Sequence, residues 1–381
     1  MKKLLILLLV LGIVFSTGLV SVAANHTTDE SSEEYLVMFD GPAEKGLLQA
    51  FGVKTEDILY EYSLKPVVHL ELTSKQARGL QNHPQIKYVE KNAEAQAFGQ
   101  TVPWGVPHVQ STEVHNMGQT GTGVKVAILD TGIDNTHEDL AANVKGGHSV
   151  FTDTANKDPF YDGSGHGTHV AGTVGAIDNN LGVIGVAYQS DLYAVKVLNN
   201  DGSGSYAGIA EGIEWSILNG MDIINMSLGG SQSSSILKEF CDLAYDEGLL
   251  VVAAAGNSGN RGGNNDSVGY PAKYESVIAV AAIDENNNRA SFSSTGPAVE
   301  ISAPGVSVLS TIPGNGYASY NGTSMASPHV AGVAALVWGE HAHLTNKELR
   351  NLLNNTAIDL GRSNQFGNGL VQAKDAIDFV R

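Results

Sequence analysis

Four residues far apart in this sequence have the side chains of a hydroxyl-based acyl-transfer centre: Asp130, His166, Asn257 and Ser324. A hydroxyl is a poor nucleophile at neutral pH and needs a base within hydrogen-bond reach. His166 can be that base, while Asp130 can hold its tautomer and stabilise the imidazolium. The amide of Asn257 and the backbone N–H of Ser324 can receive the negative oxygen that forms. The chemistry expected is therefore nucleophilic attack by Ser324.

Ser324 stands at the start of a predicted buried helix. The small residues Asn321 to Thr323 precede it, and the apolar run Val330 to Trp338 follows. A helix N-terminus has free N–H groups and a partial positive charge, which favour negative charge on a substrate. Taken alone, Thr323 or Ser324 is more simply read as a helix cap. The stretches around Asp130 and His166 decide for the nucleophile.

Asp130 and Asn257 each follow a short apolar strand pattern, Val124 to Leu129 and Val251 to Gly256. Alone, each would be an ordinary polar residue of a turn. Asp130 begins an Asp-Thr-Gly motif that also occurs in aspartic proteases, which need two carboxylates sharing a proton. The sequence contains no second Asp-Thr-Gly or Asp-Ser-Gly, so that interpretation is weak.

His166 lies between Gly165 and Gly167, which let backbone and substrate approach the imidazole closely. His166 and His169 could be imagined as metal ligands. However, they lack the glutamate and the spacing of a zinc-binding helix, so a metal site is disfavoured. We expect His169 to have a structural role on the helix that follows.

The chain order Asp, His, Ser argues against an α/β-hydrolase. That fold needs the serine first, then the acid, then the histidine, and no histidine follows Asp359. Its Gly-x-Ser-x-Gly motif is also absent, because the segment Gly322 to Ala326 ends in alanine.

The elements that position these residues alternate between short apolar strands and helices from Gly99 onward. This pattern predicts an α/β fold, with a mostly parallel sheet covered by helices on both faces. In such sheets ligands bind beyond the carboxyl ends of the strands. The expected strands are 124–129, 192–197, 222–226, 249–254 and 277–281, and the expected helices are 168–174, 207–219 and 236–247.

Two segments precede this main domain of residues 99–381. Residues 1–24 have a basic start, an apolar core and a small-residue end, which predict a cleaved signal peptide rather than a membrane anchor. Residues 25–98 indicate a small α+β module. Its expected strands are 35–39, 67–72 and 86–90, and its expected helices are 44–51 and 73–82.

Composition narrows the classes of partner. The net charge of −18 argues against nucleic acid, because binding phosphates needs Lys and Arg. Cys241 is the only cysteine, so no intrachain disulfide can form, and its apolar surroundings favour a buried side chain over a nucleophile. After the signal segment, no stretch is long and apolar enough to cross a membrane. An exported fold without disulfides needs another source of stability, and bound metal is one candidate.

Three stretches together resemble the subtilisin family of serine proteases, most closely the secreted Bacillus enzymes: Asp130 to Gly132, His166 to Gly172 and Gly322 to Ala331. The match runs from about Gln100 to the C-terminus. The resemblance implies the four roles assigned above, which are those known for subtilisins. It also implies a secreted, monomeric endopeptidase of broad specificity that cleaves protein and peptide substrates through an acyl-enzyme.

The resemblance further implies a substrate cleft. In the family, two edge segments pair with an extended peptide as an added strand. Small residues line the pocket for the side chain before the cut, P1. They suit a large apolar side chain and offer no carboxylate for a basic one, although the same glycines also serve to make turns. The edge residues are Gly202, Gly204, Ser227, Leu228 and Gly229, and the pocket residues are Ala254 and Gly269.

For metal, the resemblance implies a tight calcium site with hard oxygen donors. The donors are the side chains of Gln100, Asp139 and Asn179 and the carbonyls of Ile177, Leu181 and Val183. A weaker cation site would use the carbonyls of Ala272, Tyr274 and Val277, but Ala298 stands where a carboxylate is often found, which leaves Glu300 alone.

One segment departs from the family pattern. Phe151 to Tyr161 lengthens the stretch between Asp130 and His166 and contains Asp153 and Asp158. It is either an extra calcium loop or a surface insertion, and we favour the insertion because loops tolerate added residues.

The module of residues 25–98 resembles the family's propeptide, which acts as a chaperone and inhibitor of its own enzyme. Parallel sheets are rich in long-range contacts and fold slowly, so a folding template has a physical purpose. The resemblance places the cut between Phe98 and Gly99, with Phe98 left in the P1 pocket.

Three rival functions are a catalytically silent scaffold, a lipase or esterase, and a processing protease selective for basic sites. The presence of all four residues of the centre argues against the scaffold. Met325, beside the nucleophile, predicts loss of activity on treatment with peroxide, because a sulfoxide is bulkier and polar.

Overall fold

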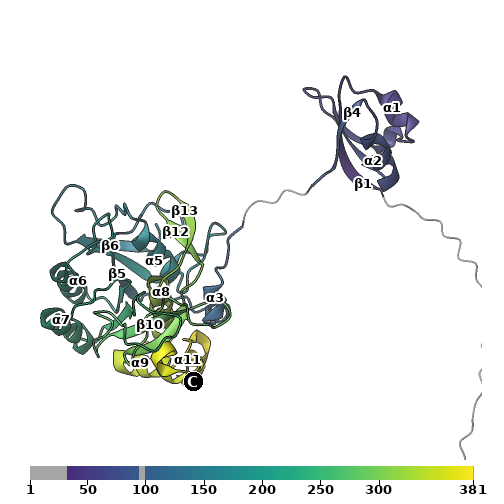
Figure 1. The fold of residues 1–381 in the computed structure, drawn as a ribbon. Coiled ribbons are helices and arrows are strands. Elements are labelled where there is room, and N and C mark those ends of the chain that lie inside the picture. Colours follow the sequence, from purple (N-terminus) through teal and green to yellow (C-terminus); the bar gives the residue numbers. More distant parts are fainter. Residues whose placement is uncertain (1–31, 94–98, 381) are drawn as a thin grey trace, which may run out of the picture. The chain divides into compact units, whose positions relative to one another are not determined.

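The computed structural model describes residues 32–93 and 99–380. The predicted signal peptide and Phe98 at the predicted junction lie outside the described residues. The chain divides into two compact units, Met1–Ala97 and Phe98–Arg381 (Figure 1).

The described part of the first unit is a four-stranded antiparallel sheet in the order β2-β3-β1-β4. Its apolar face is buried, with Val37, Leu70 and Leu80 fully covered. Helix α2 begins with the predicted cap, where Thr73 Oγ1 accepts from Gln76 N and Thr73 N donates to Gln76 Oε1. The elements are β1 (Glu33–Phe39), α1 (Lys45–Ala50), the 3₁₀ turn η1 (Thr55–Asp57), β2 (Ile58–Glu61), β3 (Val67–Leu72), α2 (Ser74–Gln81) and β4 (Ile86–Lys91).

The second unit is organised around a seven-stranded sheet in the order β11-β10-β9-β8-β5-β7-β6, in which all neighbours are parallel. Its inner strands are almost wholly buried, as continuous apolar runs predict. The strands are β5 (Lys125–Asp130), β6 (Val144–Ser149), β7 (Asp191–Lys196), β8 (Ile223–Met226), β9 (Leu250–Ala254), β10 (Ile278–Ile283) and β11 (Val299–Pro304).

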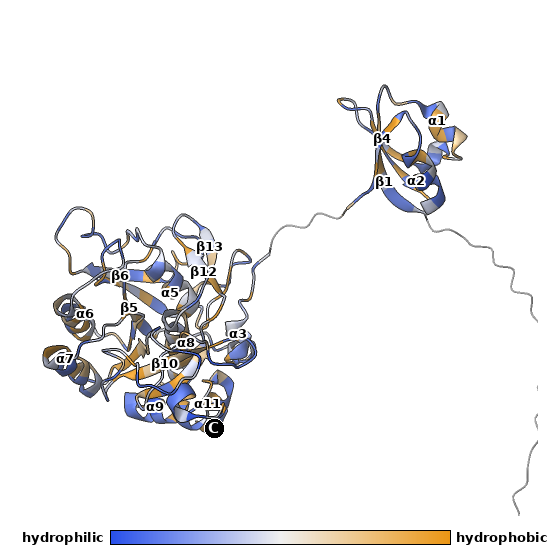
Figure 2. Ribbon diagram, in the orientation of Figure 1, coloured by the Kyte–Doolittle hydropathy of each residue, from blue (hydrophilic) through white to orange (hydrophobic). Residues whose placement is uncertain are grey.

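Helices cover both faces of this sheet. Along β5, Val126 and Ile128 pack in one core with α5 and α8, while Ala127 and Leu129 pack in the other with α6 and α7. The strands near β10 are apolar, whereas the outer helices α9 and α11 carry polar residues (Figure 2). The helices are α3 (Gly105–His108), α4 (Ser111–Asn116), α5 (His166–Gly175), α6 (Tyr206–Leu218), α7 (Ser235–Asp246), α8 (Thr323–Glu340), α9 (Asn346–Asn355), α10 (Ser363–Phe366) and α11 (Ala373–Val380).

The predicted α/β fold with helices on both faces is confirmed. The sequence analysis did not anticipate the outer strands β6 and β11, or the hairpin of β12 (Val308–Ile312) and β13 (Gly316–Tyr320). Strand β6 has the sequence VKGGHS and lacks an apolar run, because it lies at the sheet edge and none of its residues is fully buried. Among the described residues, none of the helices has the length and apolarity needed to span a bilayer.

Candidate active site

Asp130 is the last residue of β5 and is fully buried at the carboxyl edge of the sheet. Its Oδ1 accepts a hydrogen bond from the backbone N–H of Thr131 at 2.7 Å. The same oxygen lies 2.7 Å from Nδ1 of His166. An ionised carboxylate there fixes the proton of the neutral imidazole on Nδ1, which leaves Nε2 as the basic nitrogen.

His166 is the first residue of α5 and follows Gly165, whose φ of 81° favours glycine. Burial disfavours the charged imidazole, but the charge of Asp130, its hydrogen bond and the charge of Asp162 outweigh that effect, so the pKa of His166 lies above its ordinary value. The side chain stays 28% exposed, which leaves the ring accessible to a substrate.

Asp162 fixes the start of α5, four residues before the histidine. Its Oδ1 accepts from Gly165 N at 2.8 Å and from Thr131 Oγ1 at 2.7 Å. Its Oδ2 accepts from Thr168 N and Thr168 Oγ1. A carboxylate at a helix N-terminus is favoured by the free N–H groups and the helix dipole. Asp162 therefore joins the turn after β5 to the helix that carries His166.

Ser324 is the second residue of α8, the predicted buried helix. Its Oγ donates to the carbonyl of Ser227 at 3.0 Å, and Ser227 Oγ donates to the carbonyl of Ser324 at 2.7 Å. The structure thus joins Asp130 to His166 directly, whereas the Ser324 hydroxyl points to Ser227. Catalytic hydrogen bonds are commonly long or misaligned without substrate and tighten in the complex.

Two N–H donors converge beside Ser324. Asn257 Oδ1 accepts from Thr323 N and Thr323 Oγ1, both at 3.0 Å, which leaves its Nδ2 facing away from Thr323. A methyl group built on Gly322 would lie 3.5 Å from Asn257 Nδ2 and 3.5 Å from Ser324 N. Both nitrogens therefore lie next to one small space, where two N–H donors could stabilise an oxyanion.

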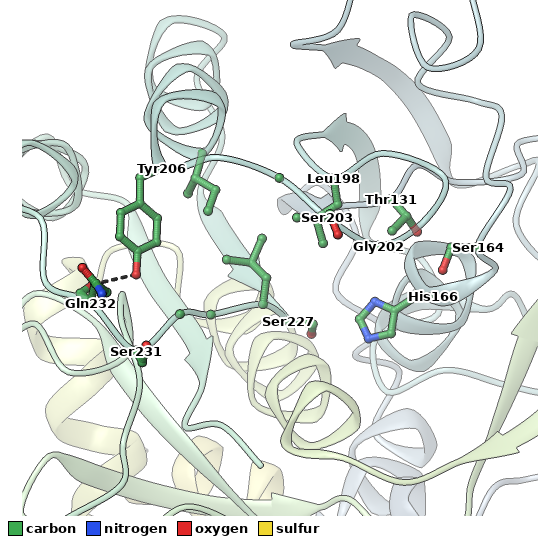
Figure 3. Close-up of a pocket in the computed structure, with 15 residues that line it drawn as sticks. Thr131, Ser164, His166, Leu198, Gly202, Ser203, Tyr206, Ser227, Ser231 and Gln232 are labelled. Atoms are coloured by element: carbon green, nitrogen blue, oxygen red, sulfur yellow. Dashed lines mark hydrogen bonds between the residues drawn. The ribbon is translucent and has the colours of Figure 1, made fainter. Parts of the chain in front are cut away.

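A cavity of about 690 Å³ adjoins His166 (Figure 3). Gly202 and Gly204 line one side, and Ser227, Leu228 and Gly229 line the other. Tyr206 stands at the end away from His166, where its hydroxyl donates to the carbonyl of Gln232 at 2.6 Å (Figure 3). All five predicted edge residues thus border one cavity.

A second cavity of about 560 Å³ contains Ser324 and Asn257 in its lining, together with the predicted pocket residues Ala254 and Gly269. It shares residues 228–231 with the first cavity. The predicted small residues contribute no carboxylate, but Asp266 also lines this cavity. However, Asp266 Oδ2 lies 2.6 Å from Nζ of Lys273, another lining residue, so the carboxylate is already paired.

His169 does not face His166 as a second metal ligand. Its Nε2 lies 3.0 Å from the carbonyl of Val308 and 3.1 Å from that of Ala318, and its ring stacks on Tyr320 with centroids 4.4 Å apart. Burial lowers the pKa of His169 to about 4, so the ring is neutral above that pH. These contacts agree with the expected structural role.

Comparisons with known proteins decide the family. The model of the subtilase family matches residues 121–369. The chain belongs to the subtilase family. It is 47% identical to a thermostable alkaline protease of Halalkalibacterium halodurans, over 94% of this chain and 96% of that protein. It is also 47% identical to alkaline elastase YaB of Bacillus sp., over 97% and 96%, and 44% identical to subtilisin E of Bacillus subtilis, over 98% and 99%.

This subtilase is a serine endopeptidase, since family and relatives agree over almost the whole chain. Three short stretches of the sequence were enough to indicate this family. It did not single out Asp162, Lys196 or the Asp266–Lys273 pair. Of these, Asp162 had a visible signal, because an acidic residue just before a predicted helix is typical of a helix start.

The donors expected to bind calcium in this subtilase lie together. Gln100 Nε2 donates to the carbonyls of Ile177 and Val183 at 2.6 and 2.9 Å, so these two oxygens face one point. Asn179 Nδ2 donates to Asp139 Oδ1 at 2.9 Å. Turning the Gln100 amide would direct its oxygen to the two carbonyls. With the Asp139 carboxylate and the Asn179 amide oxygen, this gives the hard-oxygen set that calcium prefers. Leu181 lies in the same loop, and its N–H donates to Asn179 Oδ1.

In the described ranges there is no group of three or more His, Cys, Asp or Glu side chains that could hold a metal ion. The expected calcium donors include a single carboxylate, so they would not form such a group. We find that the residues fit calcium at this first site.

The residues of the weaker cation site do not fit a metal ion. The carboxylate of Glu300 binds Arg350 through two hydrogen bonds, of 2.7 and 2.5 Å. Arg350 Nη2 also lies 3.4 Å from the carbonyl of Val277. The carbonyl of Tyr274 accepts from Val277 N at 3.0 Å, and Ala272 is buried nearby. The guanidinium of Arg350 therefore already neutralises the Glu300 carboxylate that a metal ion would need.

Proposed function

We propose that this subtilase is an exported, calcium-stabilised endopeptidase of broad specificity that prefers large apolar P1 residues and is made as a precursor. The observation that carries the proposal is that Asn257 Nδ2 and Ser324 N lie next to one small space. Asn257 and Ser324 also line the same cavity. The hydrogen bond between Asp130 and His166 supports it. Relatives named as alkaline proteases agree with it.

The proposed mechanism begins with rotation of the Ser324 hydroxyl from Ser227 towards the substrate. Nε2 of His166 takes the hydroxyl proton while Oγ attacks the carbonyl carbon of the scissile peptide. Asp130 stabilises the imidazolium, and Asn257 Nδ2 and Ser324 N donate to the oxyanion. His166 then gives the proton to the leaving amine, and water hydrolyses the acyl-enzyme by the same route in reverse. Loss of the Asn257 donor should lower kcat by about 10²–10³.

The proposed cleft holds the substrate as an added strand. The segments around Gly202–Gly204 and Ser227–Gly229 border the cavity beside His166 and offer backbone groups on both sides. The P1 side chain would enter the neighbouring cavity between Ala254 and Gly269. Small walls leave room there for a large apolar side chain.

We also propose that residues 1–24 are a signal peptide and that residues 25–98 are the propeptide, which inhibits the enzyme of residues 99–381. The small antiparallel unit folds around its own core, as a separate inhibitor domain requires. Autoprocessing after Phe98 would release the mature, monomeric enzyme. Calcium would be held by Gln100, Asp139, Asn179 and the carbonyls of Ile177, Leu181 and Val183, where it would tie the N-terminus of the mature chain to the loop after α5.

A fluorophosphonate probe and a casein digest test the function together. The wild-type chain should be labelled once, at Ser324, and should digest casein, whereas Ser324→Ala should do neither and should accumulate as the uncut precursor. N-terminal sequencing of the wild-type product should begin at Gly99. Digestion of casein by purified Ser324→Ala would overturn the assignment of the nucleophile.

A further inference from the structure

Lys196 is a fully buried lysine next to the catalytic carboxylate. It ends β7 and is the register partner of Asp130 on the neighbouring strand β5. Its Nζ donates to the carbonyl of Thr131 and, at 3.0 Å, to Oδ1 of Asn200. Within residues 32–93 and 99–380 no ion pair is formed by this ammonium group. The carboxylates that favour this charge through space, without a direct contact, are Asp162, Asp130, Asp153 and Asp158. A buried charge whose direct contacts are neutral oxygens is costly, so its position calls for a functional reason.

Thr131 links this ammonium to the catalytic pair (Figure 3 shows Thr131 and His166 on the same side of the cavity). The carbonyl of Thr131 accepts from Lys196, while its N–H donates to Asp130 Oδ1. Its Oγ1 accepts from Gly167 N at 2.9 Å, in the first turn of α5. The lysine therefore holds the residue that contacts both the carboxylate and the helix of the catalytic histidine.

Asn200 connects Lys196 to the segment Phe151 to Tyr161, whose purpose the catalytic mechanism leaves unexplained. Besides accepting from Lys196, the Asn200 side chain donates through Nδ2 to the carbonyl of Ala155 at 2.9 Å. The backbone N–H of Asn200 donates to Asn156 Oδ1 at 3.0 Å. Its Oδ1 also accepts from Gly163 N at 3.2 Å, three residues before His166. Asn200 thus links the segment to Asp130, through Lys196 and Thr131, and to the turn that precedes His166.

We propose that Lys196 is a positioning residue for the Asp130–His166 pair and that Asn200 anchors it to segment 151–161. This inference rests on the proposed catalytic roles of Asp130 and His166. Lys196 acts in two ways: it fixes the turn that orients Asp130, and its positive charge opposes the imidazolium form of His166. The segment is then a brace for the catalytic edge of the sheet.

The charged groups around His166 determine what removal of this charge should do. Asp130 on β5 and Asp162 before α5 favour the imidazolium. Lys196 is the register partner of Asp130 on β7, and in this proposal its positive charge opposes the imidazolium. Helix α5 contributes His169 and helix α8 contributes His329, and burial lowers the pKa of each to about 4, so both are neutral when His166 titrates. Tyr320 on β13 stacks on His169. Loss of the Lys196 charge should therefore raise the pKa of His166, because the two carboxylates then act without this opposing charge.

The test is the pH dependence of kcat/KM on a peptide p-nitroanilide with phenylalanine at P1. Lys196→Met keeps the stem and removes the charge, and Asn200→Asp neutralises the ammonium in place. Both should move the acid limb of the kcat/KM profile, where activity is lost as His166 is protonated, to higher pH by about 0.5 pH unit. In both variants kcat should fall by a larger factor than KM changes. Lys196→Arg should keep the wild-type limb. Asn200→Ala should lower kcat several-fold and leave the limb in place, because the charge remains.

Lys238→Met is the matched control, because Lys238 is an exposed lysine paired with Asp242 on α7. It should keep both the limb and kcat. An acid limb within 0.1 pH unit of wild type in Lys196→Met and Asn200→Asp would overturn the inference. Should Lys196→Met fail to fold, Asn200→Asp decides.

Failure of the proposed function would look different. Wild-type protein without peptidase activity or fluorophosphonate labelling would contradict that function itself. The NMR titration of His166 in Ser324→Ala, with and without Asn200→Asp, would still report the effect of the Lys196 charge. An unchanged titration there would overturn the inference independently of turnover.

Discussion

At the level of single side chains, the ion pair of Asp266 and Lys273 sets the charge of the cavity that we propose for the P1 side chain. The two groups lie 2.6 Å apart in the lining of the cavity and are 39% and 30% exposed. Each reduces the field of the other, so the cavity favours neither charge, which supports the proposed preference for a large apolar P1 side chain. A basic or acidic P1 group would have to compete with the existing partner.

Removal of one partner should therefore change the charge preference. Lys273→Gln frees Asp266, and kcat/KM for a P1 lysine substrate relative to P1 phenylalanine should rise about three- to tenfold, because the pair is partly solvated. Asp266→Asn should raise kcat/KM for a P1 glutamate substrate relative to P1 phenylalanine. The measurement is kcat/KM for three matched peptides that differ only at P1. The double variant serves as control and should return to the wild-type preference, and equal ratios in all four proteins would contradict this role.

Met325 follows the nucleophile and is only 2% exposed. Its Sδ would lie 3.6 Å from a methyl group built on Gly322, next to the two nitrogens proposed as oxyanion donors. Oxidation adds a polar oxygen to the sulfur, so peroxide should lower kcat at least several-fold with little change of KM. Stopped assays with mass spectrometry of the Met325 peptide follow the loss, and Met325→Ala should retain its activity in peroxide. Complete conversion to sulfoxide at full kcat would contradict the prediction.

Single residues differ in how far the sequence could reveal them. Asp130, His166 and Ser324 are recognisable because each stands in a distinctive run of small residues. Lys196 and Asn200 are not, since their importance comes from contacts with Thr131 and Ala155, which are distant in the sequence. The pairing of Asp266 with Lys273 spans only seven residues, but nothing in the sequence indicates that both line the proposed P1 cavity.

Among the elements, α8 is central because it carries Ser324 and packs against five strands of the sheet, β5, β8, β9, β10 and β11. Fourteen of its residues between Thr323 and Val337 are buried. Close packing at Gly332 is part of this, because a methyl group there would lie 2.6 Å from Val186 Cβ. Gly339 in the last turn is different, since its nearest neighbour would be 3.4 Å away, an ordinary contact.

The same chemical change at these two glycines should thus have opposite effects. Gly332→Ala should destabilise the enzyme by about 1–3 kcal/mol through overpacking. Gly339→Ala should stabilise it by up to about 1 kcal/mol, because alanine favours a helix. Urea unfolding of both variants in the inactive Ser324→Ala background measures the difference. A Gly332→Ala variant as stable as wild type would show that Val186 yields without cost.

The sheet could be predicted from the sequence where its strands are buried on both faces, as β5, β8, β9 and β10 are. Strand β6 could not, because an edge strand needs no apolar run and its glycines indicate a loop. The cap of α2 at Thr73 was predictable, since a capping box is a local pattern that needs no tertiary contact.

For the whole molecule, calcium is the proposed substitute for disulfides. Asp139 supplies the single carboxylate of the first site, and its Oδ2 accepts from Val183 N at 2.9 Å. Chelation should shorten the half-life of the mature enzyme at elevated temperature at least tenfold, because a ligand bound only to the native state stabilises it by mass action. Asp139→Asn should show the short half-life with or without chelator. Equal half-lives of wild type with and without chelator would remove the calcium proposal.

Two buried histidines should make the stability of the whole fold depend on pH. Burial lowers the pKa of His169 and of His329 to about 4, against an ordinary value of 6.5. The unfolded chain therefore binds more protons between pH 6.5 and 4, and the free energy of unfolding falls as the pH falls through that window. Each histidine contributes up to about 3 kcal/mol to the loss. His166, whose pKa is raised, acts in the opposite direction, since its contribution is present at low pH and is lost as the pH rises through its folded value.

Urea unfolding of the Ser324→Ala variant between pH 7 and pH 4 measures this dependence without autolysis. His329 is the better histidine to remove, because it lies inside α8, with Nδ1 at 2.8 Å from the carbonyl of Met325, and does not border either cavity. His329→Met should lower stability at pH 7 but reduce the slope between pH 6.5 and 4, since one proton fewer is taken up on unfolding. Exposed carboxylates titrate equally in both proteins, so the difference between the two slopes isolates the histidine. Parallel pH profiles would mean that His329 is protonated in the folded enzyme, contrary to its burial.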